Sequence, residues 1–336
     1  MPDGVVVGID NGGTSNNVTV LDATGHFLID RMTEVPSRVL EGPAIAVAAL
    51  VHAFEVGLAT AGADRAAVRA VGLDTPGPAS ATGVLSSRGA TNFSDPAWWG
   101  FDLRGALEDA LGLPVVYSND GNAAALYAHH VHFGVLASER SSVSAIVGTG
   151  LGGGVIESGR IVRGASGMAG ELGHVHIPMD GLLEAGQPVP ECNCGFVADA
   201  ESVASLTGIM KNLLPYWLDR YPDHELHGVE LRSAAKRVRG LAERGDELAL
   251  AVFRQQAIAL GRLFTIAANF TDPDAFFVGG GVVEADPTFR DWFLATIREH
   301  TSLRVEQQAA STFALVPQLD MAGARGAALA AMGHFA

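Results

Sequence analysis

This chain has few cysteines and few basic residues, and each shortage argues against a class of protein. Only two cysteines occur among 336 residues, at Cys192 and Cys194. Cysteines separated by a single residue rarely pair with each other, so the sequence favours a reducing compartment over a disulfide-stabilised secreted domain. Lys and Arg number 22 against 37 Asp and Glu, a formal net charge of −15. Such a charge opposes binding to nucleic acid or to an anionic membrane as the main activity.

Long apolar segments and a leader sequence are also missing from the pattern. No apolar run reaches the length of a membrane span, and a strand-like pattern from Val5 leaves no room for a signal or transit peptide. We therefore expect a cytoplasmic protein without a membrane partner. Aromatic residues make up 7% and hydrophobic residues 48%, with 41 glycines. This composition, over a length sufficient for two domains, predicts an α/β protein with many close backbone approaches.

Two glycine-rich turns, each between apolar segments rich in β-branched residues, are the most informative feature that is present. Residues 5–14 read VVVGIDNGGT and precede a second strand-like run at 17–21, and residues 144–156 read SAIVGTGLGGGVI. Glycine permits positive φ and lets backbone N–H groups converge on a phosphate oxygen. Two copies predict an internal duplication whose turns hold the phosphates of one nucleotide from both sides.

The remaining pattern alternates strands and helices. Further strands are expected at 68–73, 114–117, 276–282 and 313–316, and helices at 43–58, 102–111, 121–130, 206–218, 234–244, 246–270 and 322–332. No linker rich in proline or serine separates two halves. We expect a first domain of residues 1–120, completed by the C-terminal helix 322–336, and a second domain of residues 121–321.

Four motifs together resemble the ROK family of sugar kinases, within the actin-like ATPase superfamily. They are DNGGT at 10–14, NDGNAA at 119–124, GTGLGGG at 148–154, and GELGH at 170–174 followed by C-x-C-G at 192–195. The resemblance extends over nearly the whole chain. It implies two related α/β domains of the ribonuclease H-like type, with mixed sheets flanked by helices and the ligand in a cleft between them.

Phosphoryl transfer needs bound phosphates, a metal ion and a base near the acceptor hydroxyl. The resemblance implies that Asp10 holds Mg²⁺ through water, although an aspartate here can also simply cap the turn. It implies that the two turns bind the phosphates of ATP. It also implies that the backbone of a third glycine run passes close to adenine or ribose, although that run can alternatively be a plain strand-to-helix turn. The residues concerned are Gly12, Gly13, Thr14, Gly148, Thr149, Gly150, Gly152 and Gly153, then Gly279, Gly280 and Gly281.

Asp120 is the candidate general base, because it follows a buried strand, precedes a helix and matches the family motif. The alternative is that Asp120 or Asn119 serves only as a helix N-cap. Family likeness further implies that Asp120 contacts the sugar together with other polar side chains. These are Asn92, Asn119, Glu171, His174 and Glu201.

Related kinases hold a structural zinc with one histidine and three cysteines. His174, Cys192 and Cys194 match three of these ligands, and Asp199 stands where the family has the fourth. A carboxylate oxygen can bind zinc, but the site is harder and weaker than one with three thiolates. His176 is a conceivable substitute ligand. The alternative is that the metal has been lost and the cysteines are ordinary thiols.

The resulting hypothesis is an ATP-dependent hexose kinase that phosphorylates a 6-hydroxyl, as a glucokinase does. The segment 178–191 is longer than in compact glucokinase-like members, so fructose, mannose, an N-acetylhexosamine or a cyclitol stay open as acceptors, and polyphosphate as a donor. The family also contains sugar-sensing repressors, but these have a DNA-binding segment before the first turn, where only four residues precede Val5. Family likeness implies a homodimer.

Overall fold

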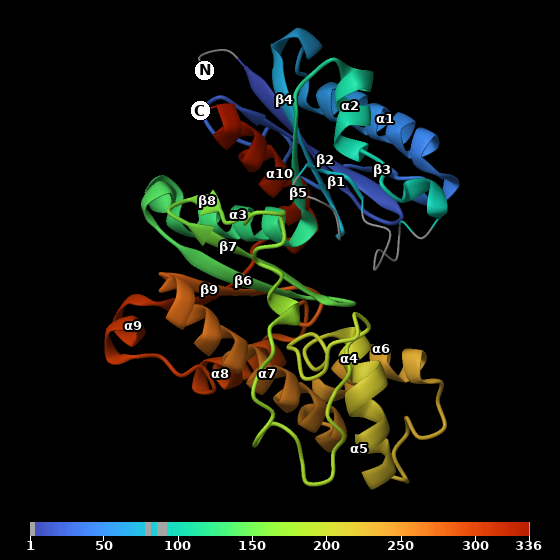
Figure 1. The fold of residues 1–336 in the computed structure, drawn as a ribbon, viewed down its shortest axis with the longest axis vertical. Coiled ribbons are helices and arrows are strands. Elements are labelled where there is room, and N and C mark those ends of the chain that lie inside the picture. The colour runs from blue at the N-terminus through green and yellow to red at the C-terminus, as the bar shows by residue number, and fades with distance from the viewer. Residues whose placement is uncertain (1–3, 78–81, 86–92, 94, 336) are drawn as a thin grey trace. The chain divides into compact units, whose positions relative to one another are not determined.

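The chain forms two compact units in a computed structural model that describes residues 4–77, 82–85, 93 and 95–335 (Figure 1). The first unit comprises Met1–Glu139, Gly154–Gly170 and Val316–Ala336, and the second comprises Arg140–Gly153 and Glu171–Leu315. Residue 120, where the sequence suggested a boundary, lies inside the first unit. The reason is that the helix beginning there, α3 (Asp120–Phe133), packs along the C-terminal helix α10 (Leu319–Phe335).

The first unit contains a five-stranded mixed sheet in the order β3-β2-β1-β4-β5. β1 and β2 form an antiparallel hairpin around the first glycine turn, β3 adds antiparallel to β2, and β4 and β5 run parallel to β1. The strands span Val5–Asn11 (β1), Ser15–Asp22 (β2), Glu34–Pro36 (β3), Val68–Thr75 (β4) and Val115–Asn119 (β5). Since β1, β4 and β5 are parallel, their carboxyl ends lie at one edge of the sheet.

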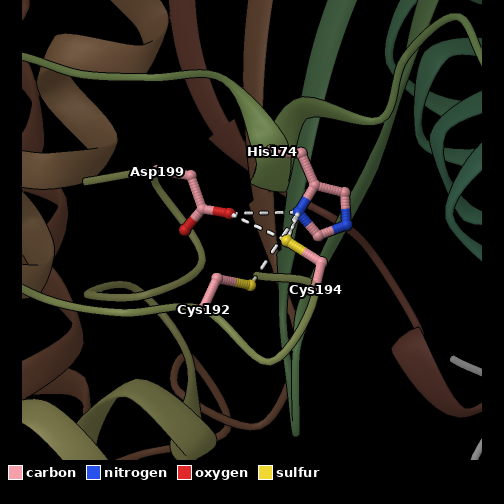
Figure 2. A group of neighbouring side chains, drawn as sticks. All are labelled: His174, Cys192, Cys194 and Asp199. Carbon is pink, nitrogen blue, oxygen red and sulfur yellow. Dashed lines mark hydrogen bonds and ion pairs between the residues drawn. The ribbon is translucent and has the colours of Figure 1, made fainter. Parts of the chain in front are cut away.

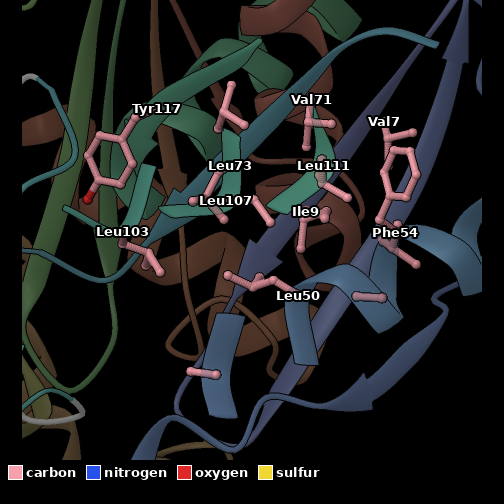
Figure 3. Packing of buried hydrophobic residues seen from close by; sticks show 14 of the residues in the cluster. Val7, Ile9, Leu50, Phe54, Val71, Leu73, Leu103, Leu107, Leu111 and Tyr117 are labelled. Atoms are coloured by element: carbon pink, nitrogen blue, oxygen red, sulfur yellow. The ribbon is translucent and has the colours of Figure 1, made fainter. Parts of the chain in front are cut away.

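One face of this sheet carries the apolar core of the first unit. Helices α1 (Pro43–Ala61) and α2 (Leu103–Leu111) cover it, and Figure 3 shows their leucines and Phe54 against the strand residues Ile9 and Leu73. α2 starts at Asp102, whose carboxylate accepts from the backbone N–H of Gly105 at 2.8 Å, a regular N-cap. Because side chains alternate between the two faces of a strand, every second strand residue points into this core.

The other face of the same sheet is covered by α10, whose backbone lies directly against the backbone of the strands. A Cβ placed on Gly8 of β1 would lie 2.0 Å from the carbonyl oxygen of Ala324, and one on Gly72 of β4 would lie 1.9 Å from that of Ala327. Side chains at these two strand positions would prevent the helix from resting on the sheet. The two glycines are thus a packing requirement of the first unit.

A second five-stranded sheet has the order β10-β9-β6-β7-β8. β9 runs parallel to β6 and to β10, and β7 runs antiparallel to β8. The strands span Ser142–Val147 (β6), Leu151–Glu157 (β7), Arg160–Ile161 (β8), Ala275–Gly279 (β9) and Thr312–Leu315 (β10). Read from β8, the second sheet has the order β8-β7-β6-β9-β10, which matches β3-β2-β1-β4-β5 of the first sheet strand by strand. This equivalence confirms the predicted internal duplication and the α/β fold class.

The second unit contains more helix than strand. α7 is largely buried, as predicted from a sequence that is apolar on most faces, and α8 packs against it, with Phe253 edge-on to Phe289 and Phe293. The helices span Leu206–Gly208 (α4), Leu214–Arg220 (α5), Leu231–Ala242 (α6), Glu247–Thr271 (α7), Pro287–Glu299 (α8) and Val305–Ala310 (α9), with a π-helical turn at Ile209–Leu213. Short 3₁₀ turns occur at Val39–Glu41, Arg65–Ala67, Pro96–Trp98, Gly134–Glu139 and Leu172–His174.

The expectation that no segment has the length and apolarity of a membrane span was wrong for α1. With 19 residues and a mean hydropathy of 1.8, it is long and apolar enough to cross a membrane by those two measures. His52 and Glu55 interrupt its apolar run, which is why the uninterrupted runs in the sequence are shorter. Leu50, Phe54 and Leu58 of this helix lie in the core of the first unit, so we interpret α1 as a core helix.

The close approach of α10 predicts the effect of one methyl group. Gly72→Ala should lower the free energy of unfolding by about 1–3 kcal/mol or more, because the helix backbone must move away from β4. Urea-induced unfolding measures this value. Gly333→Ala is the matched control, since Gly333 is exposed in α10 and no atom from outside this helix lies within 4 Å of the place that its new methyl group would take. It should leave stability unchanged or slightly higher. Equal unfolding curves for Gly72→Ala and wild type would contradict the packing argument.

Candidate active site and metal centre

The first glycine turn connects β1 to β2 in the first unit. Gly12 donates its backbone N–H to the carbonyl oxygen of Ser15 at 2.9 Å, which closes the turn and leaves Gly13 and Thr14 at its tip. Asp10 lies in β1 just before the turn, and its Oδ2 accepts from Asn17 Nδ2 at 3.3 Å. Burial raises the pKa of Asp10, although hydrogen bonds from Asp74 and Asn17 oppose the effect.

A second carboxyl group, Asp74, faces Asp10 from the neighbouring strand. The two residues are partners in the parallel register of β1 and β4. A Cβ placed on Gly323 of α10 would lie 2.9 Å from Oδ2 of Asp10 and 3.0 Å from Oδ2 of Asp74, so the two oxygens converge below this helix. Among the described residues, none provides an N–H or hydroxyl donor to either oxygen of Asp74, which is fully buried.

The pair can therefore form a hydrogen bond only if one carboxyl group keeps its proton. Burial, followed by the negative charges of Asp10 and Asp120, raises the pKa of Asp74 well above its ordinary value. We accordingly treat Asp74 as the protonated partner and Asp10 as the acceptor. The sequence did not single out Asp74 as a site residue. Its position at the end of a buried parallel strand was the signal that could have identified it.

Asp120 and Asn119 lie where β5 ends and α3 begins. Asn119 is the N-cap of α3, and its Oδ1 accepts the backbone N–H of Asn122 at 2.8 Å. Asp120 is exposed, and its Oδ1 accepts the N–H of Gly121 at 2.7 Å. The capping role weighed for these residues thus falls on Asn119, whereas the Asp120 carboxylate lies outside the core of its unit. Asn92, the other sugar ligand predicted from this part of the chain, lies outside the described residues.

The second glycine turn belongs to the second unit and joins β6 to β7. Gly148 donates its N–H to the carbonyl oxygen of Gly150 at 2.9 Å, and Thr149 is exposed at the tip. Gly153 follows in β7, where a Cβ would lie 2.2 Å from the carbonyl oxygen of Ser144 on β6. The glycines of this turn and strand thus permit a compact bend with its backbone open to a ligand.

A cavity of about 310 Å³ adjoins this turn within the second unit. Gly148 and Thr149 line it on one side and Gly281, just after β9, on another; α6 and α7 supply further walls. The wall residues from these two helices, which the sequence pattern did not identify, are Ala235, Lys236, Arg239, Phe253 and Gln256. Its volume lies within the range of small-molecule sites, at about 300–1,000 Å³.

The third glycine run explains how the chain turns at this cavity. Gly279 is the last residue of β9, and Gly280 adopts a φ of 92°, which glycine accepts most readily. A Cβ on Gly280 would also lie 2.1 Å from the carbonyl oxygen of Val147, at the end of β6. The run therefore brings Gly281 to the cavity wall.

Three predicted sugar ligands of the second unit are held by backbone contacts. Glu171 is the N-cap of the 3₁₀ turn Leu172–His174, and its carbonyl oxygen accepts the N–H of His174 at 3.2 Å. Glu201 donates its backbone N–H to the carbonyl oxygen of Gly173 at 2.8 Å. The structure thus places Glu201 directly beside the turn that contains His174.

His174, Cys192, Cys194 and Asp199 converge on one point, as Figure 2 shows. His174 Nδ1 lies 3.1 Å from Asp199 Oδ2 and 3.6 Å from Cys194 Sγ, and Cys192 Sγ lies 4.0 Å from the same nitrogen. Ligand atoms on a tetrahedral zinc, with bonds of about 2.0–2.3 Å, are about 3.3–3.8 Å apart. The three distances lie in or near this range, and all four ligand atoms lie within 4.8 Å of one another, so small side-chain shifts would complete a tetrahedral site. His176, the substitute ligand considered above, is not a member of this group.

Hydrogen bonds and burial shift the pKa values of three of these four side chains. The hydrogen bond to Asp199 raises the pKa of His174 to about 9, although burial opposes the shift. Burial works against ionisation of Asp199 as well, but hydrogen bonds from His174 and Ser202 outweigh it and lower the pKa. Burial is the chief cause of the raised pKa of Cys192. Because ligands bind metal in their deprotonated forms, metal binding must displace the protons of the imidazole and thiols.

These features define a class of protein: a duplicated α/β protein with two glycine turns, a cavity of nucleoside size and a histidine–cysteine–aspartate cluster. The model of the ROK family matches residues 6–333, so the chain belongs to the ROK family, as its motifs indicated. A glucokinase of Halalkalibacterium halodurans is 32% identical over 306 residues, which are 89% of this chain and 86% of that protein.

Two solved structures extend the comparison to the fold. A ROK hexokinase from Thermus thermophilus is 30% identical with a TM-score of 0.77, over 98% of this chain and 99% of that one. A ROK family glucokinase from Streptomyces griseus, crystallised with glucose and AMPPNP, is 28% identical with a TM-score of 0.70 over the same shares. These likenesses confirm the predicted fold class.

The Asp10–Asp74 pair predicts how stability changes with pH. Asp74 holds its proton more tightly in the folded chain than in the unfolded chain, so the folded state binds more protons and loses stability as the pH rises above about 4. Asp74→Asn removes this charge and can donate to Asp10. In Mg²⁺-free buffer, the variant should gain unfolding free energy over wild type at pH 8 and little at pH 4. Asp109→Asn, an exposed position on α2, should show no such trend. A gain for Asp74→Asn that is the same at both pH values would contradict the assignment.

Proposed function

We propose that this protein is an ATP-dependent sugar kinase that phosphorylates a hexose, at the 6-hydroxyl as a glucokinase does. The observation that supports it most is the position of the second glycine turn on the wall of a nucleoside-sized cavity, within one unit. A phosphate-binding turn beside such a cavity suits a nucleotide, because the phosphates need backbone N–H groups and the base needs apolar walls. Identity of 32% to a glucokinase and 30% to a ROK hexokinase supports the choice of sugar as acceptor.

The two glycine turns are proposed to bind the phosphates of ATP. Gly148, Thr149, Gly150, Gly152 and Gly153 serve this purpose in the second unit, and Gly12, Gly13 and Thr14 in the first. Gly279, Gly280 and Gly281 let the chain pass the nucleoside. Asp10 is the residue proposed to hold Mg²⁺ through water, since a carboxylate is the ligand that this ion prefers. Mg²⁺ would neutralise charge on the transferred phosphate.

Asp120 is proposed as the general base. Its exposed carboxylate at the start of α3 can accept the proton of the acceptor hydroxyl while that oxygen forms its bond to the γ-phosphorus and the bond to ADP breaks. Asn119, Asn92, Glu171, His174 and Glu201 are proposed to bind the sugar hydroxyls. Amide, carboxylate and imidazole groups suit this role because a hydroxyl both donates and accepts.

The cluster His174, Cys192, Cys194 and Asp199 is proposed to hold a structural zinc. The distances between its four ligand atoms support this assignment, as does the soft character of its two sulfur atoms. The ion would fix the loop that contains these ligands rather than take part in phosphoryl transfer. A homodimer and a cytoplasmic location, both implied by family likeness, stay predictions.

The acceptor and the base can be tested together. We expect ADP release with at least one of glucose, mannose, fructose, N-acetylglucosamine, N-acetylmannosamine and allose, and a loss of about 10²–10⁴-fold in kcat for Asp120→Asn, because the amide cannot take a proton. The affinity of the variant for ADP should stay at the wild-type value, which controls for folding. Turnover by Asp120→Asn at the wild-type rate would refute the base, and replacing ATP by polyphosphate in the same assay identifies the donor.

Metal analysis tests the zinc site. The purified protein should contain close to one zinc per chain, and Cys194→Ser should contain much less because a soft ligand is lost. Asp199→Cys, which supplies a third thiolate, should resist removal of zinc by a chelator for longer than wild type. Zinc near zero in wild type under metal-replete expression would contradict the proposal.

A further inference from the structure

Glu201 connects the metal centre to the second glycine turn. Its Oε2 accepts the backbone N–H of Leu151 at 2.8 Å, and its Oε1 accepts the Cys192 thiol at 3.3 Å. Gly150 makes this approach possible, because a Cβ there would lie 2.5 Å from the same Oε2. One carboxylate therefore contacts both the turn proposed to bind phosphate and a ligand of the metal cluster. All of these residues belong to the second unit.

The chain following Glu201 strengthens the link to the turn. Leu206 donates its N–H to the carbonyl oxygen of Gly148 at 3.0 Å, and Thr207 donates both its N–H, at 3.1 Å, and its hydroxyl, at 2.8 Å, to that of Thr149. The tip of the turn is thus bonded to the first two residues of α4. Its backbone amides can face a ligand only in the orientation that these bonds allow.

The chain preceding Glu201 provides the link to the metal. Asp199 offers Oδ2 to His174, while its Oδ1 accepts the N–H of Ser202 at 2.8 Å and its carbonyl oxygen accepts the Ser202 hydroxyl at 2.6 Å. The carboxyl group of Asp199 is fully buried, so it has one orientation for both bonds. Holding Asp199 at the metal consequently holds the backbone of the short turn in which Glu201 lies.

We propose that Glu201 is a positioning residue through which the metal centre orders the second glycine turn, so that metal loading raises the affinity for the phosphates of a nucleotide. This role rests on the proposed nucleotide binding of that turn and is additional to a contact with sugar. The physical reason is pre-organisation: a turn already held in its bound shape loses less conformational entropy when the ligand arrives.

Binding of ADP in the absence of sugar tests this role, because a residue that touched only the sugar would not affect it. Isothermal titration of zinc-loaded wild type with ADP and Mg²⁺ gives the reference Kd. Glu201→Ala should weaken ADP binding about tenfold, the usual worth of a hydrogen bond to a charged group. Glu201→Gln keeps an acceptor for Leu151 N–H and should recover most of that affinity. Thr207→Val, which removes only the hydroxyl bond to Thr149, should weaken binding less.

Removal of the metal completes the cycle. Chelation should weaken ADP binding by wild type in the same direction, and should have little further effect on Glu201→Ala, because the path from metal to turn is already broken. Glu191→Ala is the matched control, an exposed carboxylate next to Cys192, and should bind ADP as wild type does, with and without metal. Thermal melts of each sample verify that it is folded.

The outcomes separate this inference from the proposed function. Wild-type protein that does not bind ADP overturns both. Wild type that binds ADP, with equal affinity in Glu201→Ala or after chelation, overturns the coupling alone. Should Glu201→Ala fail to fold, Glu201→Gln and Thr207→Val decide: the coupling requires that chelation weaken ADP binding in both, and unchanged affinity on chelation overturns it.

Discussion

The close approach of backbone to backbone is the constraint on which this structure depends. In the first unit, α10 rests on β1 and β4 only because Gly8 and Gly72 have no side chain, and that contact brings Gly323 down onto the carboxyl groups of Asp10 and Asp74. In the second unit, Gly150 leaves room for the carboxylate of Glu201. The same residue type thus provides both the packing of the layers and the access of polar groups to the turns. Several of the 41 glycines therefore lie where a Cβ would collide with a neighbouring main chain or side chain.

The parallel direction of three strands places three carboxyl groups at one edge of the first sheet. β1, β4 and β5 run parallel, so Asp10, Asp74 and Asp120 come together at one edge of one sheet. Burial keeps the proton on Asp74, whereas Asp120 is exposed at a helix start. Burial and the neighbouring negative charges thereby give Asp74 a property that an exposed aspartate lacks. In the function proposed for this ROK family chain, Asp10 would hold a hydrated cation and Asp120 would accept a proton.

The metal cluster and the second glycine turn form one continuous hydrogen-bonded structure. Asp199 bonds to His174 and also holds Ser202, while Glu201, which lies between Asp199 and Ser202 in the sequence, contacts Leu151. The second carboxylate oxygen of Asp199 accepts the N–H of Ser202, whereas the single sulfur of a cysteine is a weak acceptor. The four-residue cluster and the turn are connected through a few residues of local chain, not through the hydrophobic core.

Local pattern determined the elements and the motif positions. Glycine turns between apolar runs predicted β1–β2 and β6–β7, and alanine-rich helical spacing predicted α1, α3 and α10. The family resemblance implied the four members of the metal cluster, with Asp199 at the position of a family cysteine. The sequence analysis missed α8, although Phe289, Phe293 and Ile297 recur at helical spacing, and it missed the three-residue strand β3. It also did not identify Asp74 or the cavity residues Arg239 and Gln256. Those residues lie far apart along the chain, and only the pairing of strands and the packing of α6 against α7 bring them to their sites. Sequence therefore decided which groups are available, while tertiary structure decided which of them are buried and adjacent, because burial and distance belong to the folded chain and not to the order of its residues.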